Sequence, residues 1–216
     1  MIVLDKYNLT VLTIPKCGCT TLKHWAFEVE NGFQFRAFTA NGRRRAVHFF
    51  YKNKTWPERQ AELTQRGALD LPTIAILRSP QERFLSAFRN RIFQTEDILK
   101  AGAPPGLDAF PSLETFCQNF DSYSEMASIN HHFRPQLDYL PKVDSIDFLF
   151  RMEDFGKVND FLNDRTGREI PFVRTQTSKR SPEGKESELG LAMMAELVKE
   201  RFSADMDAYS SVPKLA

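Results

Sequence analysis

A run of β-branched and apolar residues breaks into a short glycine-containing loop, and an amphipathic helical pattern follows directly. The run covers Leu9 to Ile14, and the loop reads Pro-Lys-Cys-Gly-Cys-Thr-Thr from residue 15. A strand that leads through such a loop into a helix creates an anion site, because the first N–H groups of the helix lack partners and the helix dipole is positive there. We therefore expect a cradle for a phosphate or a sulfate, the alternative being that Pro15 and Gly18 only form a tight turn.

The order of residues in this loop differs from that of loops that bind nucleoside triphosphates. Those loops place a lysine directly after their last glycine and a magnesium-binding hydroxyl after the lysine. Here Lys16 precedes Gly18, while Thr20 and Thr21 add hydroxyls to the first helical turn. The pattern weakens the case for a small-molecule kinase of the P-loop type, which remains the alternative enzyme.

A second strand-to-helix junction lies near the middle of the chain. Thr73 to Leu77 is almost entirely apolar, as is usual for a strand covered on both faces. Arg78 follows at the carboxyl end of this strand, the edge at which open α/β sheets bind ligands. Ser79 and Glu82 predict a capping box at the start of the next helix, and Ser86 lies two turns into that helix.

The two junctions, in this order, resemble the binding loops of sulfotransferases that use 3′-phosphoadenosine 5′-phosphosulfate (PAPS). The first is similar to their 5′-phosphosulfate loop, and Arg78 to Ser86 is similar to their 3′-phosphate motif. Two later segments, His131 to Gln136 and Phe150 to Phe155, are similar to recurring pieces of carbohydrate sulfotransferases of the Golgi-type and bacterial branch. The resemblance implies PAPS as co-substrate, no metal, and a carbohydrate or glycoconjugate acceptor. It implies that PAPS is bound by Pro15, Lys16, Cys17, Gly18, Cys19, Thr20, Thr21, Arg78 and Ser86.

The chemistry of these residue types agrees with the resemblance. A guanidinium matches phosphate oxygens in a bidentate manner, so Arg78, with the hydroxyl of Ser86, suits the 3′-phosphate. Lys16 can stabilise the charge that develops on the leaving oxygen during sulfuryl transfer, which needs no metal ion. Cys17 and Cys19, with His24 nearby, lack the spacing of a metal site.

A general base must take the proton of the acceptor hydroxyl, and histidine suits this role near neutral pH. Family members similar to this chain place a catalytic histidine after the first helix, and we assign this role to His48. The alternative is that His48 is a polar residue in a half-buried strand. His131 and His132 are rival bases, and Glu28 and Glu30 are further candidates.

Two further polar segments could contribute to the site. The first has two interpretations, and no contacts are assigned to the second. Arg43 to Arg45 stands beside His48 and is either a solvated turn or a site for an anionic sugar, since arginine binds carboxylates and sulfates. Ser178 to Arg180 lies in a polar loop, from about Thr175 to Glu186, where relatives close over the bound nucleotide. The motif there is too loose to assign contacts.

Repeated strand-to-helix units predict an α/β fold of three layers, with a central, mainly parallel sheet flanked by helices, as in P-loop nucleoside triphosphatases. A helix is expected from Pro80 to about Ile92, and another from about Lys185 to Phe202 that covers the sheet. The 216 residues, of which 42% are hydrophobic, predict a single sulfotransferase domain over residues 1–216.

The overall charge and hydropathy exclude some partners. The net charge of +1 provides no field for nucleic acid, and no stretch approaches the length of a membrane span. We therefore expect a cytoplasmic, bacterial enzyme. The remaining hypothesis is a catalytically inactive nucleotide-binding module, and the sequence does not indicate the oligomeric state.

Overall fold

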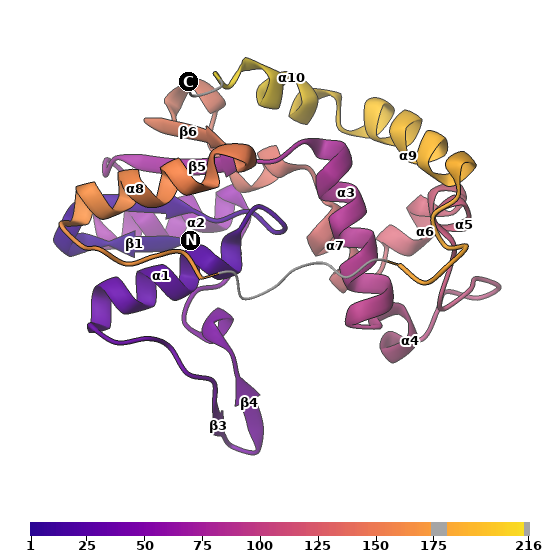
Figure 1. The fold of residues 1–216 in the computed structure, drawn as a ribbon, viewed down its shortest axis with the longest axis horizontal. Helices are drawn as coiled ribbons and strands as arrows, with labels where there is room; N and C mark the ends of the chain where they lie inside the picture. Colours follow the sequence, from indigo (N-terminus) through magenta and orange to yellow (C-terminus); the bar gives the residue numbers. More distant parts are fainter. Residues whose placement is uncertain (174–180, 214–216) are drawn as a thin grey trace. The chain divides into compact units, whose positions relative to one another are not determined.

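The computed structural model describes residues 1–173 and 181–213, which form two compact units (Figure 1). The chain passes from the first unit to the second after Arg78 and returns at Gln136. The prediction of one domain over residues 1–216 stays a prediction. The first unit contains residues 1–78, 136–173 and 210–213, and the second contains residues 79–135 and 181–209.

A four-stranded sheet is the centre of the first unit, and it confirms the predicted α/β fold. The strand order is β1-β2-β5-β6. β1 is antiparallel to β2, with Ile2 opposite Val11, whereas β2, β5 and β6 run parallel, with Val11 opposite Ile74. The strands are β1 (Ile2–Leu4), β2 (Leu9–Leu12), β5 (Thr73–Leu77) and β6 (Phe148–Arg151).

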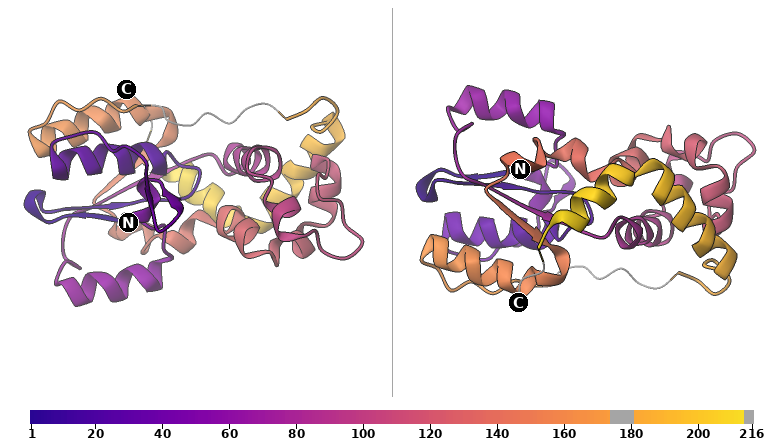
Figure 2. Two further views of the ribbon diagram at one scale, coloured as in Figure 1. Left: turned by 90° about the horizontal axis from the view of Figure 1, so that it is seen from below. Right: turned by 90° about the horizontal axis from the view of Figure 1, so that it is seen from above.

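Helices cover both faces of this sheet (Figure 2). α1 (Cys19–Asn31) and α8 (Phe155–Thr166) lie on one face, and α2 (Trp56–Arg66) lies on the other. The apolar face of α1 is buried, and Gly32 and Gly167 end α1 and α8 in the left-handed conformation. The core between sheet and helices contains Leu9, Val11, Leu22, Trp25, Ala26, Val29, Ile74, Ile76, Val158 and Leu162.

A β-hairpin follows α1 and corrects the interpretation of the arginine run as a turn. β3 (Phe38–Ala40) pairs with β4 (Arg43–Arg45), so the arginines form a strand. The turn is Asn41-Gly42, and both residues have positive φ angles, 52° and 69°. An Asn-Gly pair is the strongest short-range sequence signal for a hairpin, because a tight hairpin turn requires positive φ angles at both of its residues. In Figure 1 the hairpin extends away from the four-stranded sheet.

The second unit is helical and contains an aromatic core. Phe84, Phe116 and Phe133 are buried there, with ring centroids 4.8 to 6.0 Å apart. Met194 and Val198 join this core, so α9 packs against α3 and α5 and not against the sheet, which corrects the expectation for this helix. The helices are α3 (Pro80–Phe88), α4 (Asp97–Ala101), α5 (Leu113–Gln118), α6 (Phe120–Ser124), α7 (Ala127–Phe133), α9 (Glu188–Arg201) and most of α10 (Ser203–Ser211).

The start and the end of α3 differ from the sequence prediction. Ser79 precedes the helix, but its side chain makes no capping hydrogen bond, so the predicted capping box is absent. A capping box does form at α2, where the backbone N–H of Thr55 donates to Glu58 at 2.7 Å. α3 ends at Phe88 and continues as a π-helix over Arg89–Gln94.

Candidate active site

The loop between β2 and α1 has the backbone of an anion cradle. Gly18 is the N-cap of α1, with φ 69°, and Lys16 also adopts a positive φ of 70°. A Cβ atom at Gly18 would lie 2.5 Å from the ring of Phe155, so both the conformation and the packing require glycine. Because glycine carries no side chain, its position leaves the N–H groups of the first turn to a ligand.

The side chains of this loop also suit an anion. Residues 13–22 contain no aspartate or glutamate, and Lys16 and Thr20 are half-buried. The hydroxyl of Thr21 donates to the carbonyl of Val173 at 3.3 Å, which ties α1 to the segment after α8. A helix N-terminus with lysine and hydroxyl donors and no carboxylate fits the sulfate and phosphate of PAPS.

A buried amide joins this loop to the end of β5. Gln136 is fully buried, and its Nε2 donates to the carbonyl of Arg78 at 2.9 Å. Its Oε1 accepts from the backbone N–H of Arg78 at 3.0 Å and from the thiol of Cys17 at 3.2 Å. The Arg78 guanidinium donates to the carbonyl of Lys16 at 3.3 Å. The two junctions found in the sequence therefore meet at one edge of the sheet.

His48 lies beside the first turn of α1. It is exposed and belongs to a short 3₁₀-helix, Val47–Phe49, and not to the half-buried strand of the alternative interpretation. Its Nε2 is 3.2 Å from the hydroxyl oxygen of Thr20. The structure thus brings the predicted base to the predicted anion loop.

A buried lysine contacts the Nδ1 side of the His48 ring. Lys23 has 0% exposure, and its Nζ is 2.9 Å from Nδ1 of His48 and 2.7 Å from Oδ1 of Asn53. The same Oδ1 accepts from the hydroxyl of Thr13 at 2.9 Å, and Thr13 accepts from the α-amine of Met1 at 3.0 Å. A continuous chain of hydrogen bonds therefore runs from Met1 to His48 beneath the loop.

Arg59 adds a second buried cation to this region. It is fully buried, and its guanidinium donates to the carbonyl of Thr13 and, at 2.6 Å, to that of Lys54. Burial lowers the pKa of Arg59 to about 10, so it stays charged near neutral pH. Burial is also the main cause that lowers the pKa of Lys23 to about 8, and the charge of Arg59 acts in the same direction. Positive charge is therefore concentrated beneath the anion loop.

The other predicted site residues belong to other helices or to later turns of α1. Ser86 is buried on α3 in the second unit, and His131 and His132 lie on α7 in the same unit. Glu28 and Glu30 are on α1, about 12 and 15 Å along the helix axis from Thr20, which disfavours both as bases at the loop. Ser178 to Arg180 lies outside the described residues.

The described residues contain no group of three or more His, Cys, Asp or Glu side chains that could hold a metal ion. Cys17, Cys19 and Cys117 are buried and form no disulfide with one another. No helix within residues 1–173 and 181–213 is both long and apolar enough to cross a membrane.

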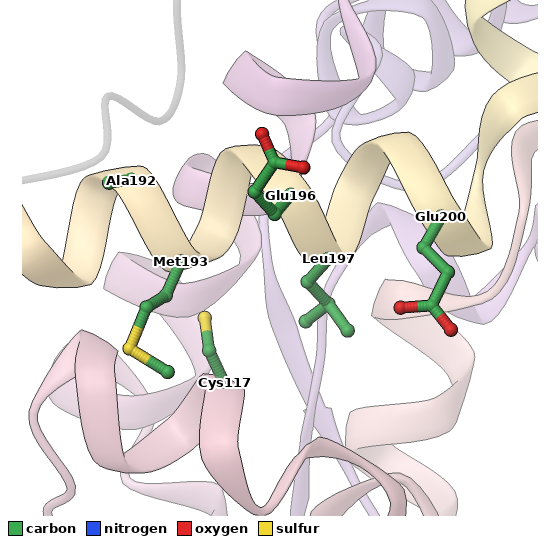
Figure 3. A pocket seen from close by; sticks show the side chains of 6 residues that line it. All are labelled: Cys117, Ala192, Met193, Glu196, Leu197 and Glu200. Atoms are coloured by element: carbon green, nitrogen blue, oxygen red, sulfur yellow. The ribbon is translucent and has the colours of Figure 1, made fainter.

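A pocket of about 400 Å³ lies in the second unit between α5 and α9 (Figure 3). Met193 and Leu197 point from α9 toward the helix that carries Cys117. Glu196 and Glu200 supply the charge of its lining. Two carboxylates would repel an anionic nucleotide, so this pocket does not suit PAPS.

Comparison with protein families supplies the decisive observation. Residues 1–209 match the sulfotransferase family. The chain belongs to the sulfotransferase family. Its members are PAPS-dependent transferases, which decides against the kinase alternative. Searches of curated proteins and of solved structures found no match to this sulfotransferase.

Sequence reasoning missed three polar residues of this site, of which Lys23 and Gln136 are buried and Asn53 is half-buried. Lys23 follows the loop on α1, where a lysine ordinarily indicates a solvated face. Asn53 lies in a connecting segment without a motif, and Gln136 appears only as the last residue of a family-like segment. The single sequence signal for Lys23 is its place between Thr20 and Phe27, which flank it on the same helical face.

Proposed function

We propose that this enzyme transfers a sulfuryl group from PAPS to a hydroxyl of a carbohydrate or glycoconjugate, with His48 as the general base. When bound, PAPS supplies the activated sulfuryl group. The segment from Pro15 to Thr21 holds the 5′-phosphosulfate, and Arg78 and Ser86 bind the 3′-phosphate.

The contact between His48 and Thr20 carries the proposal. Nε2 of His48 lies 3.2 Å from the hydroxyl oxygen of Thr20, a residue in the first turn of the anion loop. A base at this position stands next to the group to be transferred, which is the geometry that removal of the acceptor proton requires. The rival bases His131 and His132 lie on α7 in the second unit.

Lys16 acts on the leaving group. It stabilises the negative charge that develops on the oxygen between sulfur and phosphorus, an effect that is strongest in a site closed to water. The buried charge of Arg59 beneath the loop favours the anionic ligand further. Lys16 therefore contributes to the rate, whereas the loop backbone contributes to binding.

The hairpin supports an acceptor that carries negative charge. Residues 33–50 include four arginines, five phenylalanines and no acidic residue. Phe33, Phe49 and Phe50 are 50 to 61% exposed, and the Arg45 guanidinium lies 4.8 Å from the ring of Phe49. His48 belongs to the same segment, so an acceptor whose hydroxyl reaches its Nε2 also meets this aromatic and basic surface. Anionic glycoconjugates suit such a surface because arginine pairs with carboxylates and sulfates.

The role of His48 is tested by replacing each candidate histidine with alanine. His48→Ala should lower turnover by about a hundredfold to ten-thousandfold. Binding of 3′-phosphoadenosine 5′-phosphate, measured by calorimetry, should stay at the wild-type level. His131→Ala and His132→Ala are the matched controls and should keep most of the activity. Strong loss in either control, with a mild effect of His48→Ala, would move the base to α7, and nucleotide binding without transfer to any acceptor would indicate an inactive module.

The acceptor class is tested on the hairpin. A double variant, Arg43→Gln with Arg44→Gln, should raise KM for anionic acceptors and leave KM for neutral acceptors unchanged. Arg66→Gln is the control for loss of positive charge outside the hairpin, because it removes one arginine charge from α2, where Arg66 pairs with Asp5 at 2.6 Å. Equal effects on anionic and neutral acceptors would contradict this assignment.

A further inference from the structure

The contact between Lys23 and His48 joins two groups that can each gain or lose a proton. Nζ of Lys23 lies 2.9 Å from Nδ1 of His48, and Lys23 has no exposed surface. Its other hydrogen-bond partner is Oδ1 of Asn53, at 2.7 Å, and that oxygen also accepts from Thr13. A fully buried lysine beside a proposed base needs a chemical reason, because lysine is rarely buried without an acidic partner.

Burial is the main effect that opposes the ammonium form of Lys23. Among the charged groups, Arg59 of α2 lowers the pKa of Lys23. The α-amine of Met1 belongs to the same network, and its own pKa lies well below the usual range, through burial first and then through Arg59 and Lys23. The thiol of Cys19 acts in the opposite direction on Lys23. Glu62 favours the charged forms of the α-amine and of Arg59, and Glu58 also favours the charged form of Arg59. Lys23 therefore loses its proton more readily than an ordinary lysine.

The protonation state of Lys23 sets the tautomer of His48. An ammonium group only donates, so a charged Lys23 requires Nδ1 to accept, and the ring hydrogen of neutral His48 then sits on Nε2, toward Thr20. In that form Nε2 cannot take a proton. A neutral amine can accept, so Nδ1–H donates to Nζ and Nε2 keeps its lone pair.

We propose that Lys23 is a positioning residue that selects the tautomer of His48, and that only neutral Lys23 leaves Nε2 able to act as the base. This inference rests on the proposed role of His48. In the transfer step the acceptor O–H bond breaks and its proton moves to Nε2. The acceptor oxygen bonds to sulfur, and the bond from sulfur to the bridging oxygen breaks with its electron pair on that oxygen. The hydrogen on Nδ1 then passes to Nζ, which leaves neutral His48 and a Lys23 ammonium.

The tautomer is tested without any substrate. In ligand-free protein with 15N-labelled histidine, NMR reports which ring nitrogen of His48 carries hydrogen, and His48→Gln assigns its signals. We expect His48 to change from the Nε2–H to the Nδ1–H form as the pH rises through about 8. Lys23→Met should abolish this change. His24, on the same helix and in edge contact with Phe35, is the internal control and should titrate alike in both proteins.

Either an unchanged His48 tautomer between pH 6 and 9.5 in the wild type, or the same change in Lys23→Met, would overturn the proposal. The wild-type titration decides the matter even where the variant does not fold. It is also independent of catalysis. Full activity of His48→Ala would refute the proposed base, while the NMR experiment would still report whether Lys23 sets the tautomer.

The pH dependence of kcat/KM provides the second readout. In the wild type, activity at pH 6.5 should be about 30-fold below its plateau, because the acid limb follows a group with a pKa of about 8. In Lys23→Met the limb should move toward the ordinary imidazole value of about 6.5, with a lower plateau. Lys23→Arg should stay poorly active at every pH, because arginine never becomes an acceptor. A lower plateau with an unmoved limb, or rescue by arginine, would indicate a merely structural lysine.

Discussion

Substitution of Lys23 by methionine should change how the stability of the enzyme depends on pH. The pKa of Lys23 falls from 10.5 in the unfolded chain to about 8 in the folded protein, and burial is the main cause. Because the folded-state pKa is the lower one, the folded protein binds fewer protons than the unfolded chain between pH 8 and 10.5. The free energy of unfolding therefore rises with pH across this window. Below pH 8, burial of the ammonium reduces stability by about 3 kcal/mol relative to high pH.

Methionine has a similar length and no charge, so the variant lacks this contribution. Urea unfolding of both proteins at pH 7 and pH 9.5 isolates it, since Arg59, the α-amine of Met1 and Cys117 titrate in both and largely cancel in the difference. The wild type should gain about 2 kcal/mol relative to Lys23→Met between these pH values. A difference that stays constant within about 0.5 kcal/mol would refute the reasoning, because Lys23 would then titrate as it does in the unfolded chain.

Three further predictions concern the loop and the end of β5. Lys16→Ala should lower turnover by about a hundredfold or more and change the Kd of 3′-phosphoadenosine 5′-phosphate far less, and near-normal turnover would remove its assigned role. Gly18→Ala should lower the free energy of unfolding by about 2–4 kcal/mol in urea titrations, because the new Cβ clashes with Phe155 and because alanine disfavours the left-handed backbone of this position. Adding Phe155→Ala should relieve the clash but not the backbone strain. In calorimetry the wild type should prefer the 3′-phosphorylated nucleotide by about 30-fold or more, and Arg78→Ala should erase most of this preference and Ser86→Ala a smaller part. Equal binding of both nucleotides by the wild type would contradict the assignment of Arg78.

The sequence was sufficient for features that local chemistry determines. The strand-loop-helix at the anion loop and the strand from Thr73 to Leu77 are both predicted correctly. Each depends on a short pattern of apolar residues or on a glycine at a positive φ angle. The Asn41-Gly42 pair is an equally clear sequence signal for a hairpin, but the three arginines that follow it favour the different interpretation of a solvated turn.

Features that depend on distant neighbours were not predictable. The sequence pattern of α9 identifies Met194 and Val198 as part of its apolar face. It does not indicate that α3 and α5, and not the sheet, cover that face. Lys23 is buried because Asn53 and His48, far along the chain, provide its partners. No spacing of residues within α1 predicts those contacts. Ser79 also forms no capping box, although the similar sequence that begins at Thr55 does form one.

The buried amide of Gln136 has a consequence for the architecture of the chain. With Arg78 it makes the reciprocal pair of hydrogen bonds that a neighbouring strand would supply through its backbone. Residues 79–135 lie between these two residues and belong to the second unit, so the amide closes the stem of an insertion at its base. Because the amide closes the stem, the length of the inserted segment adds little to the entropic cost of bringing its two ends together. Exchange of the inserted segment between relatives should therefore leave the anion loop intact, provided that α9, which packs against α3 and α5, is exchanged with it.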